Sequence, residues 1–519
     1  MNGGVTDWTG GYVADVNYIY GYYPELNPMR AQLALCSAGI VTPNIEVACE
    51  LGFGQGLSIN LHAAASDVEW YGTDFNPAQA AFAQQLAQQA KSQAHLFDQS
   101  FEAFCQRLDL PDFDYIGLHG IWSWISNKNR AVLVDFIQRK LKVGGVLYIS
   151  YNTYPGWAAT VPLRELMLQH AEFMGSEKQG VIGKIDAAID FAETLFAVNP
   201  RFASDNPQVG ARLKSLKNQN RNYLAHEYFN RDWSPMSFAQ IAQWLAEAKV
   251  QYAGSAHYQD YIDNINLTKA QQELLASLPS GSFYQTVRDF CVNQQFRRDY
   301  WVKGVRKLSA LEKREQLYEI AVVLTQLRAG FEPKIVGSLS EAKIQPAIFN
   351  PLLDCLADNK PKQLGQLVQV LKNQKITAAQ VLQAVLLLSG SGALQCAQDE
   401  AAIQSARKKT DTLNQYLMQK ARSNAEINYL ASPVTGGGIS VPRFHQLFLL
   451  GCQQHQQPKS ISAGELAQFV WQILSSQGQR LTQAGKPLET AEANLAELRS
   501  VAEKFLSNDL RIYQALQII

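Results

Sequence analysis

The sequence predicts an α/β, Rossmann-like domain at its N-terminal end, followed by mostly α-helical accessory domains. Over the first third of the chain, short apolar runs alternate with helix-like segments. This alternation is typical of a parallel sheet with helices on both faces. After Pro155 and Gly156 the strand signals fade and amphipathic helical patterns take over. A length of 519 residues favours about two to four domains rather than one core.

The predicted elements of the α/β region follow one another closely. Pro77 opens a helix rich in alanine and glutamine, because proline is well tolerated in a first helical turn. Gly144 and Gly145 introduce the last strand. In chain order we expect a strand at 45–49, a helix at 57–65, a strand at 70–73, a helix at 77–90, strands at 95–97 and 113–119, a helix at 130–141 and a strand at 146–150.

The remainder of the chain reads as helical. Amphipathic helices are expected at 163–174, 185–197 and 236–248, and the pattern stays helical from Leu308 onward. Between 348 and 397, three helices separated by turns precede a short strand. That order suits a winged-helix-like module, and a plain helical bundle fits the same pattern.

Charge and cysteine usage exclude several classes of protein. Lys+Arg and Asp+Glu both number 46, and this balance disfavours a dedicated nucleic-acid binder. One basic run fits a solvated helix face better than a phosphate-binding patch. The seven cysteines are scattered without metal-ligand spacing, so we expect neither a disulfide framework nor a metal. The basic run comprises Arg297, Arg298, Lys303, Arg306 and Lys307.

The longest apolar stretch is far too short to span a bilayer, and the N-terminus lacks the pattern of a secretory signal. We therefore expect a cytoplasmic protein with no membrane span.

A glycine-rich turn lies between the first predicted strand and the first predicted helix. It consists of Glu50, Gly52, Gly54 and Gly56. Glycines let the backbone approach a ligand, and the helix N-terminus offers unpaired N–H groups. The dinucleotide fingerprint requires a glycine where this chain has Leu57. The spacing with a leading acid instead fits S-adenosylmethionine, a cofactor without pyrophosphate, whose cationic methionine end can lie near Glu50.

Further cofactor contacts are expected where the next strands end. Asp74 ends the second strand and can accept hydrogen bonds from both ribose hydroxyls, and Asp98 ends the third and can accept from the adenine amino group. Phe75 lies close enough to pack on the adenine ring. These positions face the crevice in which doubly wound sheets bind ligands. We also assign Gln99 and His119 to the cofactor site.

At this point the sequence resembles a family. It is similar to bacterial class I methyltransferases with an attached methyltransferase regulatory domain, an architecture shared with the rickettsial protein-lysine methyltransferases that modify outer-membrane protein B. The likeness covers Tyr18 to Lys303, but the segment from Tyr18 to Pro24 departs from the family's opening pattern. The motifs that carry it are Glu50 to Gly56, Asp74, Phe113 to Gly120, Trp122 to Trp124, Ser150 to Trp157 and Tyr223 to Phe229.

The resemblance and the helical patterns together divide the chain into five segments. The expected division is a cofactor-binding methyltransferase domain at 1–160, a helical extension at 161–222, the regulatory domain at 223–307, a helical, winged-helix-like domain at 308–410 and a C-terminal helical domain at 411–519. The extension carries more apolar surface than an isolated excursion should. We expect it to pack on the regulatory domain or on a second subunit, which would make a homodimer.

An aromatic pocket is expected to hold the methyl acceptor, because methyl transfer needs positioning and exclusion of water. Aromatic faces also attract cations. Each of these aromatics could instead be a loop-packing residue. The residues assigned to the acceptor are Tyr18, Tyr22, Tyr23, Trp122, Trp124, Tyr154, Trp157 and His226, and Tyr20 lies in the same N-terminal group.

A lysine acceptor must lose a proton before it attacks. Its reference pKa of about 10.4 makes neutralisation at pH 7 cost about 4–5 kcal/mol. His119 is the leading candidate base, and Tyr151 and Asn152 are also assigned catalytic roles; His226 and Glu227 are further candidates.

The leading hypothesis is therefore a protein methyltransferase with lysine as the favoured target. Methylation of a small molecule or a glycan is the first alternative. A non-catalytic scaffold that binds S-adenosylmethionine is the second.

Overall fold

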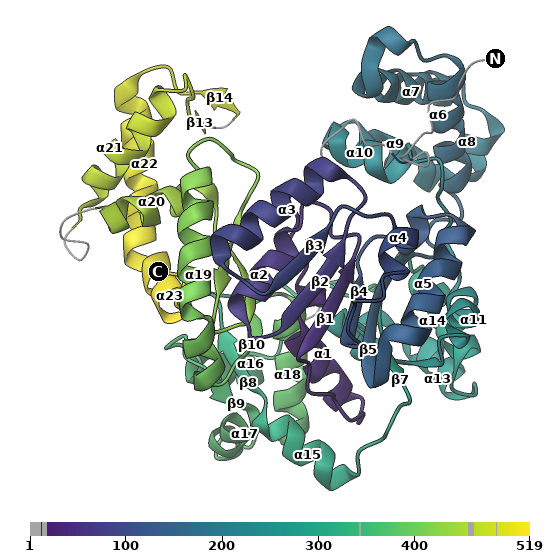
Figure 1. Cartoon of the computed structure of the whole chain (residues 1–519), viewed down its shortest axis with the longest axis horizontal. Coiled ribbons are helices and arrows are strands. Elements are labelled where there is room, and N and C mark those ends of the chain that lie inside the picture. The colour runs from purple at the N-terminus through teal and green to yellow at the C-terminus, as the bar shows by residue number, and fades with distance from the viewer. Residues whose placement is uncertain (1–11, 13–17, 342–343, 455–460, 484) are drawn as a thin grey trace.

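The computed structural model describes residues 12, 18–341, 344–454, 461–483 and 485–519. At its centre lies a seven-stranded sheet, with helices on both faces and helical modules on either side (Figure 1). The strand order is β3-β2-β1-β4-β5-β7-β6. The strands are β1 (Val47–Leu51), β2 (Glu69–Thr73), β3 (Ala94–Phe97), β4 (Phe113–Leu118), β5 (Leu141–Asn152), β6 (Val250–Ser255) and β7 (Phe296–Lys303).

Strand β7 alone among these strands runs antiparallel to its neighbours. The parallel pairs include β1 with β2, where Glu50 lies opposite Gly72, and β7 pairs antiparallel with β5, where Tyr148 lies opposite Tyr300. Both faces of the sheet are covered, so neighbouring residues of β4 enter different cores. Tyr115 packs in one hydrophobic cluster and Ile116 in another.

Three helices of the α/β region lie where the sequence predicts them, and α1 and α4 were not predicted. The predicted helices at 57–65 and 77–90 are confirmed without a shift, and the predicted strands agree to within a few residues, except that the fifth is longer at both ends. The helices are α1 (Pro28–Ser37), α2 (Leu57–Ala65), α3 (Pro77–Ala90), α4 (Phe101–Cys105) and α5 (Asn127–Lys140).

The segment expected to form a separate regulatory domain also completes the sheet. It supplies β6 and β7, together with helices α11 (Phe238–Ala246), α12 (Asp263–Asn266), α13 (Lys269–Ala276) and α14 (Ser282–Val292). The prediction that the basic run forms a solvated helix face is wrong, because the run lies on β7 and in the loop after it, and Arg297 is buried. Its Nε donates to Asp299 Oδ2 at 2.9 Å and its Nη1 pairs with Asp289. These carboxylates occupy the guanidinium, so Arg297 is not part of a phosphate-binding patch.

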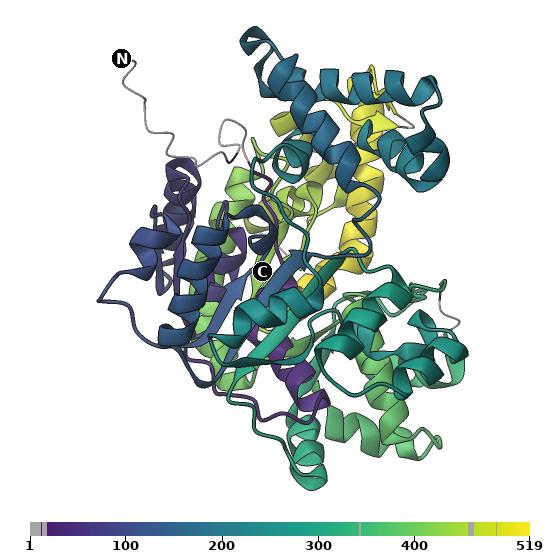
Figure 2. The same cartoon turned by 90° about the vertical axis from the view of Figure 1, so that its right-hand side faces the viewer.

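The helical extension is inserted between β5 and β6 and stands above the sheet (Figure 2). Its helices enclose a hydrophobic cluster of their own, which includes Trp157, Ile185 and Leu213. The two ends of the extension lie side by side at the sheet, where Met236 N donates a hydrogen bond to Asn152 O at 3.0 Å. The helices are α6 (Val161–Phe173), α7 (Gly180–Ala197), α8 (Arg201–Asp205), α9 (Pro207–Leu216) and α10 (Arg221–Tyr228).

The next module has the helix order of a winged-helix-like fold, but its central strand comes first in the chain. Strand β8 lies between β10 and β9 and is antiparallel to both. The elements are α15 (Ala310–Glu319), β8 (Ala321–Leu324), α16 (Pro346–Cys355), β9 (Lys362–Gln363), α17 (Leu364–Lys372), α18 (Ala378–Gly390) and β10 (Leu394–Ala397).

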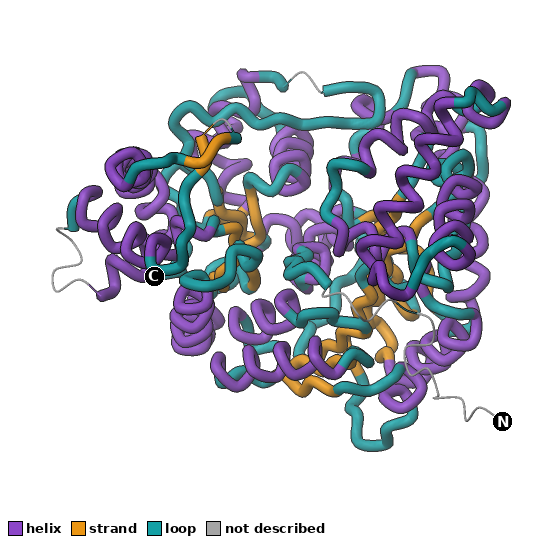
Figure 3. The backbone as a smooth tube through the Cα atoms, turned by 90° about the horizontal axis from the view of Figure 1, so that it is seen from above, coloured by secondary structure: helices purple, strands orange, loops and turns teal. Residues whose placement is uncertain are grey.

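The C-terminal helices share a core with the sheet domain. Helix α19 packs across α2 and α3, and Leu61 and Leu417 belong to one hydrophobic cluster. Seen from above, helices surround the strands on both sides (Figure 3). No helix in the described ranges is both long and apolar enough to cross a membrane. The elements are α19 (Glu400–Lys420), β11 (Tyr429–Ser432), β12 (Gly437–Ser440), α20 (Arg443–Gln454), α21 (Ala463–Ser475), β13 (Thr482–Gln483), β14 (Lys486–Pro487), α22 (Ala491–Lys504) and α23 (Leu510–Ala515).

Candidate functional site

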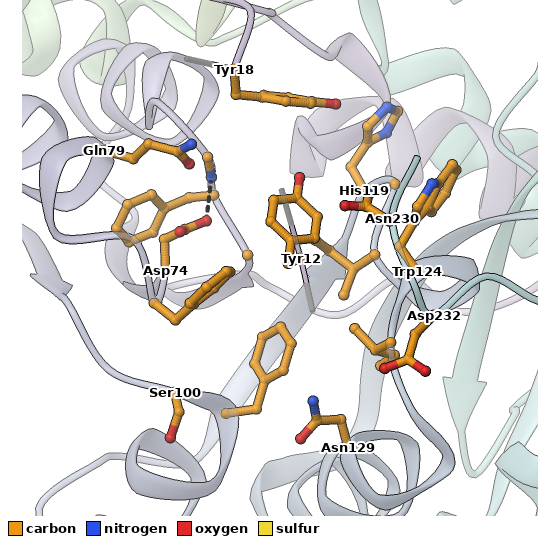
Figure 4. Close-up of a pocket in the computed structure, with 18 of the residues that line it drawn as sticks. Tyr12, Tyr18, Asp74, Gln79, Ser100, His119, Trp124, Asn129, Asn230 and Asp232 are labelled. Atoms are coloured by element: carbon orange, nitrogen blue, oxygen red, sulfur yellow. Dashed lines mark hydrogen bonds between the residues drawn. The ribbon is translucent and has the colours of Figure 1, made fainter. Parts of the chain in front are cut away.

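A cavity of about 330 Å³ opens at the carboxyl ends of the sheet strands (Figure 4). Its wall takes residues from the loops after β1, β2, β3 and β4, and from the loop that follows the helical extension. This is the edge at which doubly wound sheets bind ligands.

The glycine turn after β1 lines the cavity at Gly52 and Gly54. Both have positive φ angles, +75° and +58°, which residues with a Cβ rarely adopt. A Cβ at Gly52 would collide with Ile121. Gly56 has a different role, because a Cβ there would collide with Ala83 of α3 and Gly56 does not line the cavity. The first two glycines keep backbone close to the cavity, whereas Gly56 lets α2 and α3 approach each other.

Asp74 braces this glycine turn from the end of β2. Its Oδ2 accepts a hydrogen bond from Gly54 N at 2.8 Å, and its Oδ1 accepts one from Asn76 N at 3.0 Å. Burial raises the pKa of Asp74 to about 6, although the two backbone donors act against that rise. Each carboxylate oxygen can accept a further bond, so Asp74 can hold ligand hydroxyls while it fixes the turn.

Glu50 is a buried carboxyl group in the cavity wall, and its Oε2 has no hydrogen-bond partner among the described residues. Burial, and then the nearby charge of Asp74, raise the pKa of Glu50 to about 8. A buried carboxylate without a donor is costly unless a cation or a proton neutralises it. Glu50 is therefore suited to the cationic end of a ligand.

The floor beside Asp74 is aromatic and polar. Phe75 and Gln99, which the sequence assigns to the cofactor, line it together with Ser100 and Phe101. Asp98 is exposed and lies outside the lining, because the chain turns its side chain to solvent just after β3.

The opposite half of the cavity holds His119, Trp124, Asn230 and Asp232, and Tyr18 lies across the top between this half and Gly54 (Figure 4). This half faces the half that contains Asp74. Trp124 was predicted here from its place after β4, and its side chain is largely buried.

His119 is held rigidly at the end of β4. Its ring stacks on Tyr23 with ring centres 3.8 Å apart, and its Nδ1 lies 2.8 Å from the Tyr148 hydroxyl oxygen. Burial, aided by Arg298, lowers the pKa of His119 to about 4 despite the opposing charge of Glu25. The imidazole is therefore neutral at pH 7, and a group with so low a pKa is a weak base.

His226 lies behind the tyrosines rather than on the cavity wall. Its ring packs on Tyr18 and Tyr12, with ring centres 5.0 and 5.4 Å apart. Tyr12 lines the cavity and also contacts Phe75 edge-on at 5.6 Å.

Five further residues that were assigned to catalysis or to the acceptor lie in packed regions outside this cavity. Tyr151 donates from its hydroxyl to Asp299 Oδ2 at 2.7 Å, and Asn152 follows it at the buried end of β5. Trp157 belongs to the core of the extension. Trp122 packs against Trp244, and the Tyr22 hydroxyl lies 3.2 Å from His62 Nε2.

Tyr154 is partly exposed outside the cavity lining, and Tyr20 packs on Phe82. Trp122 and Trp124 belong to one short 3-10 helix, so their side chains leave it in different directions and only Trp124 lines the cavity.

Two groups stand out among the lining residues that the sequence does not predict. One is Tyr12, and the other is the run Asn230, Arg231 and Asp232. That run follows Phe229 directly, the last residue of a motif that was noticed. Only the return of the inserted extension to the sheet brings it to the cavity, and sequence spacing does not reveal that return.

Family models match two parts of the chain. A model described as a methyltransferase domain matches residues 49–149, and one described as a predicted methyltransferase regulatory domain matches 220–303. An uncharacterised Synechocystis protein, sll1526, is 40% identical over 516 residues, which cover 98% of this chain and 99% of that protein. An uncharacterised protein of Rickettsia prowazekii, RP789, is 25% identical over 302 residues, 55% of this chain and 53% of that protein.

Among solved structures, PKMT2 from Rickettsia typhi in complex with AdoHcy superposes with a TM-score of 0.68. It is 17% identical, and the match covers 95% of this chain and 99% of that one. This likeness extends the shared fold beyond the sheet domain to the helical modules.

Proposed function

Because the chain belongs to the class I, S-adenosylmethionine-dependent methyltransferases that carry a methyltransferase regulatory domain, we propose that it methylates the ε-amino group of a lysine in a protein substrate. The main support for this proposal is that the cavity wall combines the aromatic side chains of Tyr18 and Trp124 with the carboxylate of Asp232. This combination attracts a cationic side chain on its way to the reacting methyl group.

The residues around the glycine turn fit the cofactor. Gly52 and Gly54 leave room for it, Asp74 presents acceptors for ribose hydroxyls, and Glu50 has an unpartnered oxygen for the cationic methionine end. When bound, S-adenosylmethionine supplies an electrophilic methyl group on a sulfonium. The residues of this chain hold that group in place and keep water away from it.

The size of the cavity favours a slim acceptor. A volume of about 330 Å³ is at the low end of the range of about 300–1,000 Å³ typical of ligand pockets. The cofactor alone fills most of that space. A lysine side chain fits in the remainder more easily than a sugar ring does, which favours a protein over a glycan.

In this proposal the lysine is deprotonated mainly because its environment lowers its pKa, and not by a strong catalytic base. His119 has a pKa of about 4, so its imidazole is neutral at pH 7. The ring nitrogen that carries no hydrogen can accept a hydrogen bond and position the acceptor amine. Loss of water on burial disfavours the ammonium form and lowers the pKa of the lysine, and it acts against the attraction of Asp232 and the aromatic rings for the cation. The proton then leaves to solvent before transfer.

For assembly, we propose that the helical extension pairs with a second copy of the chain. Phe173, Met174 and Val198 are more than 70% exposed on this module, although the rest of its apolar residues pack in a core. Large apolar side chains grouped on one module are typical of an interaction surface.

Labelled S-adenosylmethionine and cell lysate test the proposed acceptor. Wild-type protein should transfer label to protein, and acid hydrolysis should release it as methyl-lysine. Trp124→Ala should reduce this label, whereas Leu108→Ala should not, because Leu108 is 99% exposed and does not line the cavity. Label in the small-molecule or glycan fraction instead of protein would contradict lysine and support the alternative acceptors.

A further inference from the structure

A second cavity, of about 210 Å³, lies at the junction of the sheet domain, the winged-helix-like module and the hairpin of β11 and β12. It is separate from the cavity at the strand ends and shares no lining residue with it. Its wall is formed by the segment from Tyr22 to Arg30, by His257 and Tyr258, by the loop from Ser389 to Cys396, and by Thr435. None of the proposed methyl-transfer chemistry uses these groups.

Two hydroxyl groups in this wall have no partner among the described residues. Ser389 Oγ and Thr435 Oγ1 are both buried, with their residues 3% and 1% exposed. Buried hydroxyls are nearly always hydrogen-bonded, because an unmade bond costs free energy. The neighbouring Ser391 shows the usual arrangement, since its Oγ donates to Leu388 O at 2.9 Å. The unpartnered pair therefore leaves hydrogen-bonding capacity in this wall that no described residue uses.

Cationic groups outnumber anionic ones here. Arg30 lines the cavity, stacks over the Tyr258 ring at 4.1 Å and donates to Ser389 O and Ala256 O. Glu25 also lines the cavity, and the Arg298 Nε lies 3.5 Å from its Oε1. Burial raises the pKa of Glu25, but Arg30 and Arg298 outweigh burial and hold it below its usual value. The carboxylate thus stays charged and neutralises only one of the two guanidiniums.

We propose that this junction cavity binds a small hydroxylated monoanion through Arg30, Ser389 and Thr435. Its head is a carboxylate or a phosphate, since both accept the donors that a guanidinium and hydroxyls offer. The volume lies below the range of about 300–1,000 Å³ that holds drug-sized ligands, so the ligand is a small metabolite rather than a nucleotide. Gly390 and Gly392 keep the wall free of side chains on that side.

The segment that forms one wall of this cavity also reaches the first cavity. Tyr23 stacks on His119 in the proposed acceptor site, and Glu25, two residues later, lines the junction cavity. The hydroxyls of Tyr115 and Tyr300 both donate to Glu25 O and fasten this segment to the sheet. A ligand in the junction cavity would therefore contact the chain segment that also carries Tyr23.

Calorimetry and thermal melting of the full chain test the site with D-glycerate, acetate and inorganic phosphate as probes. Saturating S-adenosylhomocysteine is present throughout, so that the first cavity is closed to the probes. We expect a saturable rise in melting temperature with glycerate or phosphate, and the stronger of the two identifies the head group. The binding readout does not depend on methyl transfer, so it stands or falls separately from the proposed function.

The decisive variant is Ser389→Ala combined with Thr435→Val, which keeps the shape of the wall and removes both hydroxyls. Probe binding should weaken at least about tenfold, while the melting temperature of the unliganded protein should stay the same or rise. Ser391→Ala is the matched control and should leave probe binding unchanged. Saturation by none of the three probes, or equal binding by the double variant, would overturn the proposal.

Discussion

At the scale of single residues, Glu50 governs how the empty protein responds to pH. Its pKa in the folded, unliganded protein is about 8, well above an unfolded value of about 4.3. The folded state therefore binds the extra proton, so the associated stability is present at low pH and is lost as pH rises towards 8. Asp74 and Glu227, with pKa values raised to about 6 and 7, contribute in the same direction.

We expect the melting temperature of the unliganded protein to fall between pH 6 and pH 8.5. Glu50→Gln should make that fall smaller, because the amide has no proton to lose. The same variant should weaken S-adenosylmethionine binding, measured by calorimetry at pH 8. An equal slope with pH in the variant and the wild type would show that Glu50 ionises normally.

Asp74 is expected to carry much of the cofactor affinity. Asp74→Ala removes charge-assisted hydrogen bonds to the ribose and also the brace on Gly54, so S-adenosylmethionine binding should weaken by about 1.5–3 kcal/mol. Asp98→Ala is the matched control, because Asp98 is exposed and lies outside the cavity lining. If the two variants bind the cofactor equally well in calorimetry, the assignment of Asp74 to the ribose is wrong.

Sequence reasoning works for such residues because a strand end fixes where its next side chain lies. Glu50 lies near the end of β1 and Asp74 directly follows the adjacent parallel strand β2, so their sequence positions alone place them at one edge. Tyr12 and Asp232 reach the same cavity from segments whose paths depend on tertiary packing. No local pattern in the sequence carries that information.

At the scale of elements, the loops after β4 and after β5 have different roles. Trp124, after β4, lines the cavity, whereas Tyr151 on β5 is buried and bonded to Asp299. Trp124→Ala should lower transfer to the acceptor about thirtyfold, equivalent to about 2 kcal/mol of lost cation–aromatic attraction. Its affinity for S-adenosylmethionine should stay nearly intact.

Tyr151→Phe provides the contrast. It should lower the free energy of unfolding by about 1–3 kcal/mol, because the buried Asp299 loses a donor. Transfer by the folded variant should stay near the wild-type rate. Denaturant unfolding and single-turnover kinetics measure the two effects, and a slow but fully stable Tyr151→Phe protein would restore a catalytic role for this hydroxyl.

Strands β6 and β7 show which elements a sequence pattern hides. β7 reads Phe-Arg-Arg-Asp-Tyr-Trp-Val-Lys, and its charged half resembles a solvated surface. Arg297 is nevertheless buried, because Asp289 and Asp299 neutralise it inside the fold. Pairing between charges distant in sequence is settled by tertiary structure, so the apolar periodicity that predicts β1 to β5 fails here.

At the scale of the whole molecule, the exposed apolar residues of the extension predict self-association. Phe173→Asp should shift the protein from dimer to monomer in light scattering, because a charge at the centre of an apolar contact opposes pairing. Leu108→Asp, at a fully exposed site far from the extension, should leave the mass unchanged. A wild-type protein that is monomeric at every concentration would remove this proposal.

The two ends of the helical extension lie close together, so the extension could be replaced as a unit, and we call it a cassette. The extension begins after Asn152 and ends before Met236, and a backbone hydrogen bond joins these two residues. Within the extension, Arg164 Nη2 donates to Asn230 O at 2.7 Å. An insertion with adjoining ends can lengthen, shrink or be replaced during evolution without disturbing the strands around it. Yet Asn230 to Asp232 lie at the downstream end of the extension and line the half of the cavity that we propose for the acceptor. Each exchange of the cassette would therefore also reshape acceptor selection, while the glycine turn and its cofactor contacts stay as they were.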